Sequence, residues 1–407
     1  MSNKIRRLFS RRRTFLKAFG FGVISAGLSA SDFLRASVTN QNTSVPAHCP
    51  PDVFLKLPGK LGNPALTLIE DPRLHPAIRA ELVNSSGLRP GVFPPSLTME
   101  SSYDECIKFI EYMHEQIMDS ENDAASVRES NPDVVASTEF ISREDGTKIK
   151  LFIERPRVND GSIPCIVHLH GGGMSFSSAE TFETVNWRTK IAKTGILVVG
   201  VEFRSEALSP GHHPFPSGLN DCATAVKWVK KNKLKLGITS LVVSGESGGG
   251  NLAIGLGIKA NMEGWVDIID GIYAIAPMVI GVYEDKVPNL NSWRENMGDQ
   301  GTMPMYRAMT KVYDPESSFK DDPRAWPFFA SQSVLRGLPP HIIVNYELDL
   351  IRDDGVVFAQ RLRTAGVSAN STIINGAHHV PDIAMPDVVP EMTRASLDSI
   401  SAFVKSL

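Results

Sequence analysis

A serine flanked by glycines lies where an apolar stretch gives way to a helix-forming one. The segment from Leu241 reads LVVSGESGGGNLAIGLGIKA, so Ser247 is the serine of a Gly-x-Ser-x-Gly pattern. In a nucleophile elbow this pattern forms a sharp turn from strand to helix that exposes the serine hydroxyl at the end of the sheet. The flanking glycines allow the turn, and the helix start favours developing negative charge. The pattern predicts Ser247 as the nucleophile of an acyl transfer.

Three consecutive glycines upstream are candidates for stabilising the oxyanion that acyl transfer creates. They belong to VHLHGGGM, residues 167–174, which ends another apolar stretch. Consecutive glycines present backbone N–H groups with no Cβ in the way, and one such donor to the oxyanion is worth about 2.7–4 kcal/mol. No Lys-Ser or Lys-Thr follows them, which disfavours a phosphate loop. The segment therefore predicts an oxyanion hole.

The general base is expected among the histidines that follow Ser247, because a serine elbow is followed along the chain first by the acid and then by the histidine. Of ten histidines, only His341, His378 and His379 do so. His341 opens an expected strand and so lies at the end away from the cleft. His378 and His379 both follow the expected strand 371–374, and the residues alone favour neither.

The acid of the triad must orient the imidazole and remain ionised. Asp349 ends the strand-like segment HIIVNYELD, which predicts a carboxylate at the same edge as the serine. Glu347 is an alternative on the same strand face. Asp353 and Asp354 are expected to cap a helix that begins at Gly355. Asp349 is therefore the predicted acid.

A metal site is the rival use of the histidines. His168 with His170, and His212 with His213, are close enough in sequence to share a metal, but no carboxylate or third ligand follows at a diagnostic spacing. The four cysteines form no Cys-x-x-Cys pair. We expect no metal and no cofactor.

Short Val- and Ile-rich segments alternate with helical ones, which is typical of an α/β fold with a mostly parallel, doubly wound sheet and helices on both faces. The expected strands are 134–143, 148–154, 164–170, 196–203, 241–244, 272–277, 342–346 and 371–374. The expected helices between and after them are 218–231, 249–262, 355–365 and 392–404. Hydrophobic residues make up 42% of the chain and charged residues 21%, which excludes a disordered or multispanning protein. The net charge of −3 indicates no nucleic-acid partner.

Two amphipathic helices are expected ahead of the sheet and predict a cap. The first runs from an Asp71-Pro72 start to Leu82, and the second covers 99–118. A helical excursion at 279–340 could help to roof a pocket. The predicted organisation is an irregular lead-in at 31–70, a helical cap region at 71–130 and a catalytic domain at 131–407.

The N-terminus is typical of an export signal. Residues 1–30 carry seven Lys or Arg and no acid, and their apolar part is too short to span a membrane. Within them, Arg12-Arg13-Thr14-Phe15-Leu16-Lys17 resembles the twin-arginine motif. We expect cleavage near Ala30, a periplasmic or secreted protein, the twin-arginine export machinery as a partner and no stable membrane anchor. A cytoplasmic protein is the alternative, and no feature indicates an oligomeric state.

Taken as a set, these motifs resemble those of the hormone-sensitive-lipase-like (family IV) bacterial carboxylesterases. The matching segments are His170-Gly-Gly-Gly173, Gly245-Glu-Ser-Gly-Gly249 and Asp349-Leu-Ile-Arg-Asp-Asp-Gly355, and the similarity covers roughly residues 70–405. The resemblance implies an α/β-hydrolase fold with an N-terminal helical cap and hydrolysis of small-molecule carboxylic esters of short to medium acyl chain, with lactones as a further class. The alternatives are a catalytically inactive ligand-binding α/β-hydrolase and an amidase with the same triad.

The resemblance also implies the roles of individual residues. The family places its histidine three residues after a glycine, which selects His379 when counted from Gly376. Val380 then stands where the family commonly has glycine. The family pattern assigns the oxyanion amides to Gly172, Gly173 and Gly248, with Gly171 making the turn.

Overall fold

The computed structural model describes residues 57–86, 97–118, 124–158, 161–207, 211–283, 290–296 and 302–407. The chain divides into two units, 1–55 and 56–407, of which the second contains all the described residues. The predicted signal segment, 1–30, lies outside the described residues, as does most of the predicted lead-in. No helix in the described ranges combines the length and the apolar character needed to cross a membrane.

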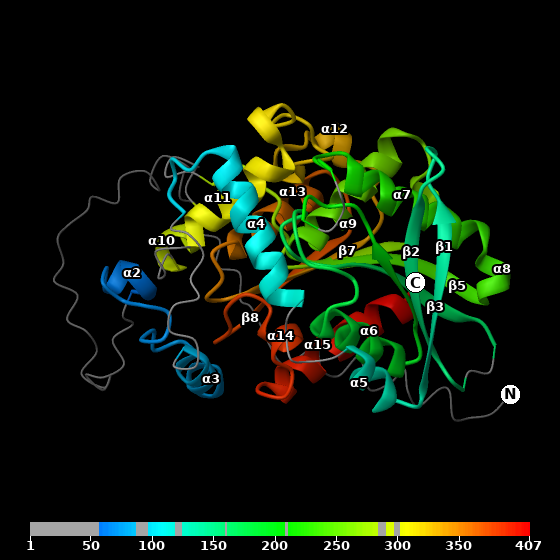
Figure 1. Cartoon of the computed structure of the whole chain (residues 1–407), viewed down its shortest axis with the longest axis horizontal. Coiled ribbons are helices and arrows are strands. Elements are labelled where there is room, and N and C mark those ends of the chain that lie inside the picture. Colours follow the sequence, from blue (N-terminus) through cyan, green and yellow to red (C-terminus); the bar gives the residue numbers. More distant parts are fainter. Residues whose placement is uncertain are drawn as a thin grey trace, which may run out of the picture. The chain divides into compact units, whose positions relative to one another are not determined.

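An eight-stranded sheet runs through the second unit in the order β1-β2-β4-β3-β5-β6-β7-β8 (Figure 1). β1 and β2 pair antiparallel, as do β2 and β4, and all other neighbours are parallel, which confirms the predicted mostly parallel sheet. The strands are β1 (Val134–Ser142), β2 (Lys148–Pro156), β3 (Ile163–Leu169), β4 (Leu197–Glu202), β5 (Ile238–Glu246), β6 (Gly271–Ile275), β7 (His341–Tyr346) and β8 (Ala369–Ile374). Each lies within three residues of its predicted bounds.

Helices cover both faces of this sheet (Figure 1). One face packs against α7 (Ser217–Lys231), α9 (Gly248–Met262) and α13 (Arg352–Thr364). The other packs against α6 (Phe182–Lys193) and α15 (Pro390–Lys405). The sequence did not predict α6, because polar residues within it are buried and obscure its helical period. Arg188, for example, is fully buried and paired with Glu154 at 3.0 Å.

The two helices predicted ahead of the sheet are present, but both begin later than expected. They are α3 (Pro76–Ser86) and α4 (Tyr103–Met118). Asp71 does not cap α3, since its carboxylate instead accepts hydrogen bonds from the backbone and guanidinium of Arg73. The start of α4 is fixed by a capping box, in which the Ser102 hydroxyl accepts from the Glu105 N–H and the Glu105 carboxylate accepts from the Ser102 N–H.

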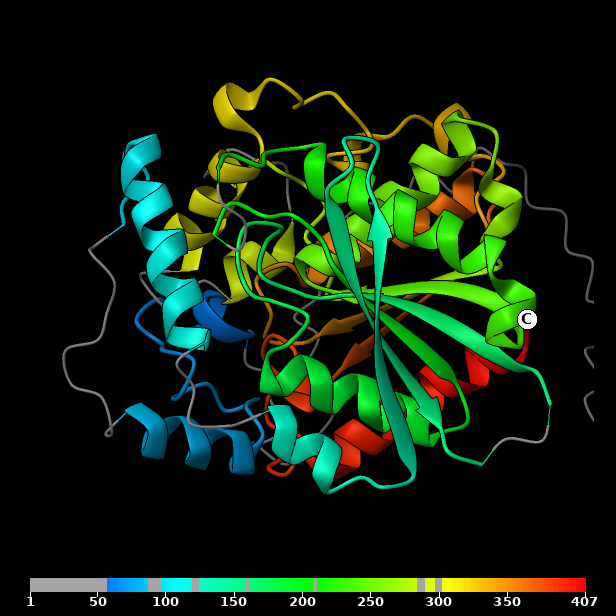
Figure 2. The ribbon, with the colours of Figure 1, turned by 45° about the vertical axis from the view of Figure 1, so that its right-hand side comes forward.

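The α4 helix packs against α11 (Thr302–Tyr313), which belongs to the predicted helical excursion (Figure 2). α4 buries Cys106, Phe109 and Ile110, which lie three and four residues apart and so share one face of the helix. The remaining short helices described are α2 (Gly59–Gly62), α5 (Ala124–Glu129), α8 (Lys233–Leu236), α10 (Asn291–Asn296), α12 (Gln332–Leu335) and α14 (Pro381–Ala384). Short 3₁₀ turns are η1 (Val266–Ile268), η2 (Pro315–Ser317) and η3 (Pro327–Phe329).

Candidate active site

Ser247 occupies the turn between β5 and α9. Its backbone has φ 55° and ψ −117°, a conformation that L-residues rarely adopt and that costs of order 1–3 kcal/mol. The Ser247 N–H donates to the carbonyl of Ile275 at 2.8 Å, which ties the turn to β6. The side chain is nearly buried, with 8% of the residue exposed. This is the strained geometry that a nucleophile elbow requires.

The glycines beside the serine are required by a close approach to β3. A Cβ added to Gly245 would lie 2.6 Å from the carbonyl oxygen of Leu169, and one added to Gly249 would lie 2.0 Å from the same atom. No side chain fits at these distances. Glycine at both positions therefore lets the elbow pack directly on the end of β3.

The predicted oxyanion loop follows β3 and lies against the elbow. Gly172 and Gly173 have φ of 103° and 58°, in the region that favours glycine. A Cβ added to Gly248 would lie 2.7 Å from the Gly173 nitrogen, so the start of α9 contacts the loop backbone. Within the described ranges, the N–H groups of Gly172, Gly173 and Gly248 donate to no protein acceptor. They are thus free to receive an anionic oxygen.

His379 and Asp349 are brought together from the segments after β8 and β7. His379 Nδ1 lies 2.7 Å from the Oδ2 atom of the buried Asp349, and the other carboxylate oxygen accepts from the Ile351 N–H at 3.2 Å. Burial alone would lower the pKa of His379, but the charge and hydrogen bond of Asp349 outweigh burial and raise it above its ordinary value. Asp349 therefore orients the imidazole and stabilises its protonated form.

The other carboxylates near Asp349 have structural roles. Glu347 accepts a hydrogen bond from the Gly376 N–H at 2.7 Å and so holds the loop that carries His379. The expectation that Asp353 and Asp354 cap a helix at Gly355 is wrong, since α13 already begins at Arg352 and both lie in its first turn. Asp353 accepts from the Ser292 N–H, and Asp354 accepts from the Tyr283 hydroxyl.

The remaining late histidines lie elsewhere. His341 opens β7 and is buried at the opposite end of the strand from Asp349, as predicted, and burial lowers its pKa to about 4. His378 is half-buried and is not among the residues that line the cavity described next. Val380, which replaces the family's glycine, has φ 47°. The valine therefore adopts the left-handed conformation that glycine favours, at some cost in strain.

A cavity of about 450 Å³ contains most of the predicted site. Ser247, His379, Gly172 and Gly173 all line it. Much of its remaining wall is apolar and comes from the loop after β3, α4, α11 and the segment after His379: Phe176, Ile117, Met305, Tyr306, Met309, Val380, Ile383 and Ala384. The helix α4 and the excursion thus both reach the cavity, whereas residues 76–84 of α3 do not line it.

The sequence missed the part played by Glu246, which also lines the cavity. Its carboxylate lies 2.9 Å from His168 Nε2 and accepts from the Gly171 N–H at 2.8 Å. The only signal was its position beside Ser247 in the elbow pattern. His170 also contacts the oxyanion loop, because its Nδ1 lies 2.8 Å from the Gly171 carbonyl oxygen, and its ring stacks on Phe203.

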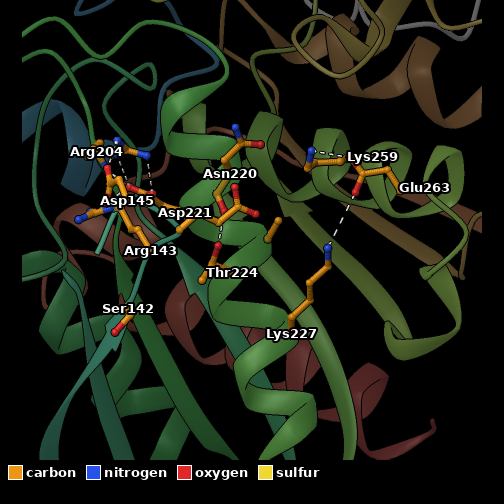
Figure 3. A pocket seen from close by; sticks show the side chains of 12 residues that line it. Ser142, Arg143, Asp145, Arg204, Asn220, Asp221, Thr224, Lys227, Lys259 and Glu263 are labelled. Atoms are coloured by element: carbon orange, nitrogen blue, oxygen red, sulfur yellow. Dashed lines mark hydrogen bonds and ion pairs between the residues drawn. The ribbon is translucent and has the colours of Figure 1, made fainter. Parts of the chain in front are cut away.

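A larger hollow of about 800 Å³ contains none of the predicted site residues (Figure 3). Its basic groups are matched by acids of the same wall: Arg143 and Arg204 both bond to Asp221, and Lys227 and Lys259 both lie near Glu263 (Figure 3). Throughout the described residues, no group of three or more His, Cys, Asp or Glu side chains is arranged to hold a metal ion.

Comparisons with known proteins show the fold and the family of the chain. The sequence profile of the family described as alpha/beta hydrolase fold matches residues 166–381. The solved structure of brefeldin A esterase, described as a bacterial homologue of human hormone sensitive lipase, superposes with a TM-score of 0.78 at 34% identity, covering 86% of this chain and 98% of that chain. The chain belongs to the hormone-sensitive-lipase-like family of α/β hydrolases.

Several curated relatives of this hormone-sensitive-lipase-like chain are esterases. Carboxylesterase NlhH of Mycobacterium tuberculosis is 28% identical over 269 residues, which cover 64% of this chain and 79% of that relative. An arylesterase of Saccharolobus solfataricus is 29% identical over 234 residues, which cover 57% of this chain and 71% of the arylesterase. The chain is accordingly a serine hydrolase that acts on carboxylic ester bonds.

The raised pKa of His379 predicts the acid limb of the pH profile. A histidine acts as base only when neutral. If His379 is the base, kcat/KM should therefore fall as the pH drops through the pKa of His379, which lies above the ordinary histidine value of 6.5. Asp349→Asn removes the charge that raises this pKa, so the limb should move to lower pH while the rate falls by about 10⁴. The measurement is kcat/KM against pH with a non-ionising ester, and a wild-type limb below pH 6.5 would contradict the prediction.

Proposed function

We propose that this esterase works through a Ser247, His379 and Asp349 triad with an oxyanion hole made by the N–H groups of Gly172, Gly173 and Gly248. The observation that carries the proposal is the 2.7 Å contact between His379 and Asp349, with His379 and Ser247 lining one cavity. A strained serine, an oriented imidazole and free amide donors together are the parts that acyl transfer needs.

In this mechanism the Ser247 hydroxyl oxygen attacks the ester carbonyl carbon while His379 Nε2 accepts the hydroxyl proton. The carbonyl oxygen becomes an oxyanion and receives hydrogen bonds from the glycine amides. Collapse of this intermediate breaks the bond to the alcohol, which leaves with the proton from His379. Water then attacks the acyl-enzyme by the same steps, releases the carboxylic acid and restores Ser247.

The proposed substrates are neutral esters with short to medium acyl chains, with lactones as a further class because their ring ester presents the same carbonyl. The cavity volume of about 450 Å³ and its apolar wall of Met305, Tyr306 and Met309 support this range. Small-molecule sites of about 300–1,000 Å³ with few polar groups are typical of such ligands.

Ser247→Ala removes the nucleophile and should reduce hydrolysis of p-nitrophenyl butyrate to the background of the assay. Ser244→Ala is the matched control, because Ser244 is a buried serine of the same strand that does not line the cavity. It should keep most of the activity. Full activity in a folded Ser247→Ala protein would refute the proposed nucleophile.

The choice between the adjacent histidines is tested by comparing His379→Ala with His378→Ala. His379 contacts Asp349 and lines the cavity, whereas His378 is not among the residues that line it. The value of kcat should therefore fall by about 10⁴ or more in His379→Ala and change little in His378→Ala. The measurement is kcat for each purified variant, with the melting temperature as a check of folding. The opposite result would assign the base to His378.

We further propose that the protein is exported in a folded state by the twin-arginine route, on the basis of the Arg12-Arg13-Thr14-Phe15-Leu16-Lys17 motif and the short apolar segment that follows it. Replacing Arg12 and Arg13 by lysine keeps the charge but removes the paired arginines. The precursor should then remain in the cytoplasm, as followed by cell fractionation and immunoblotting. Export equal to wild type would contradict the proposal.

A further inference from the structure

Glu246 is a buried acid that the proposed mechanism does not use. It is only 6% exposed, yet both of its carboxylate oxygens have partners: Oε2 lies 2.9 Å from His168 Nε2, and Oε1 accepts from the Gly171 N–H at 2.8 Å. Burial alone would raise the pKa of Glu246, but His168 and the Gly171 amide outweigh burial and lower it. The side chain is therefore an ionised acceptor at neutral pH.

The two partners of Glu246 connect the nucleophile to the oxyanion loop. Glu246 is the last residue of β5 and precedes Ser247, while His168 lies on β3 and Gly171 follows the end of β3. β3 and β5 are parallel neighbours, with Leu169 opposite Gly245. One carboxylate thus joins the strand that carries the serine to the loop that carries the amide donors.

The oxyanion loop has some hydrogen bonds of its own, since the Gly172 carbonyl accepts from the Ser175 and Phe176 N–H groups and the Gly173 carbonyl accepts from the Ser175 hydroxyl. These bonds lie within the loop and do not tie it to the strand that carries Ser247. Gly172 and Gly173 have no side chains to pack and can adopt many backbone conformations, whereas an oxyanion hole is effective only when its donors are fixed before the reaction. The hydrogen bond from the Gly171 N–H fixes the residue directly before them. A Cβ added to Gly171 would lie 3.6 Å from the Cβ of Ser247, so this anchor acts next to the nucleophile.

We propose that Glu246 is a positioning residue that, braced by His168, holds Gly171 and thereby aims the N–H groups of Gly172 and Gly173 at the oxyanion. This inference rests on the proposed role of those amides. In this role Glu246 must provide an oxygen that accepts from the Gly171 N–H. The negative charge of the carboxylate strengthens that hydrogen bond.

The test compares two neutral replacements of similar length. In Glu246→Gln the amide oxygen still accepts from the Gly171 N–H, while Glu246→Met has no oxygen acceptor. We expect kcat for p-nitrophenyl butyrate to fall by about 10- to 100-fold in Glu246→Met, with KM little changed. This decrease does not exceed the decrease in kcat that removal of one oxyanion-hole donor causes. Glu246→Gln should retain most of kcat.

A trifluoromethyl ketone inhibitor supplies a readout that a loss of stability would not move. Its hemiketal oxygen, formed on Ser247, occupies the oxyanion position, so its inhibition constant should rise in Glu246→Met by the same factor as kcat/KM falls. Glu246→Asp, which keeps the charge but shortens the side chain, should also lose kcat, and it provides the same test if Glu246→Met does not fold.

Asp314 provides a matched control outside the cavity. Its buried carboxylate also accepts from one backbone N–H, that of Phe319, and from one ring N–H, that of Trp326. Asp314→Leu should lower the melting temperature to a degree similar to Glu246→Met but leave kcat near wild type.

The outcomes separate this inference from the proposed triad. Wild-type kcat in folded Glu246→Met and Glu246→Asp, an equal loss in Glu246→Gln, or an equal loss in Asp314→Leu would each overturn the positioning role while Ser247→Ala remains inactive. Activity in Ser247→Ala would instead refute the proposed mechanism itself.

Discussion

The site depends on how closely the nucleophile elbow packs on the end of β3. The carbonyl oxygen of Leu169 leaves no room for a side chain at Gly245 or Gly249, so the strand that carries Ser247 and the strand that leads into the glycine loop end side by side. Because β3 and β5 are parallel neighbours, both segments leave the sheet at the same edge. Ser247 and the proposed amide donors Gly172 and Gly173 consequently line one cavity.

Features encoded by a few neighbouring residues could be predicted from the sequence. The elbow around Ser247 follows from its glycines and from the strand and helix on either side. The buried parallel strands could be predicted from runs of Val and Ile, because a strand that helices cover on both faces is apolar along its length. Asp349 followed from its place at a strand end. The residues alone favoured neither His378 nor His379, and only the family pattern selected His379. The structure pairs His379 with Asp349.

Features that depend on partners distant in the sequence could not be predicted. Arginine usually indicates a solvent-exposed position, but Arg188 of α6 is buried because its guanidinium pairs with Glu154 on a strand of the sheet. Glu246 is the same case in the site, because its role comes from His168 and Gly171, some 75 residues away or more.

Met309 of α11 occupies the space beside Gly173. A Cβ on that glycine would lie 2.2 Å from the methionine sulfur, and the same methionine forms part of the cavity wall. In the proposed mechanism, the side chain that lines the acyl pocket therefore also contacts the backbone of a proposed oxyanion donor. A smaller side chain at position 309 would widen the cavity and also remove this contact, so on the proposed mechanism the room for substrate and the placement of an amide donor depend on one residue.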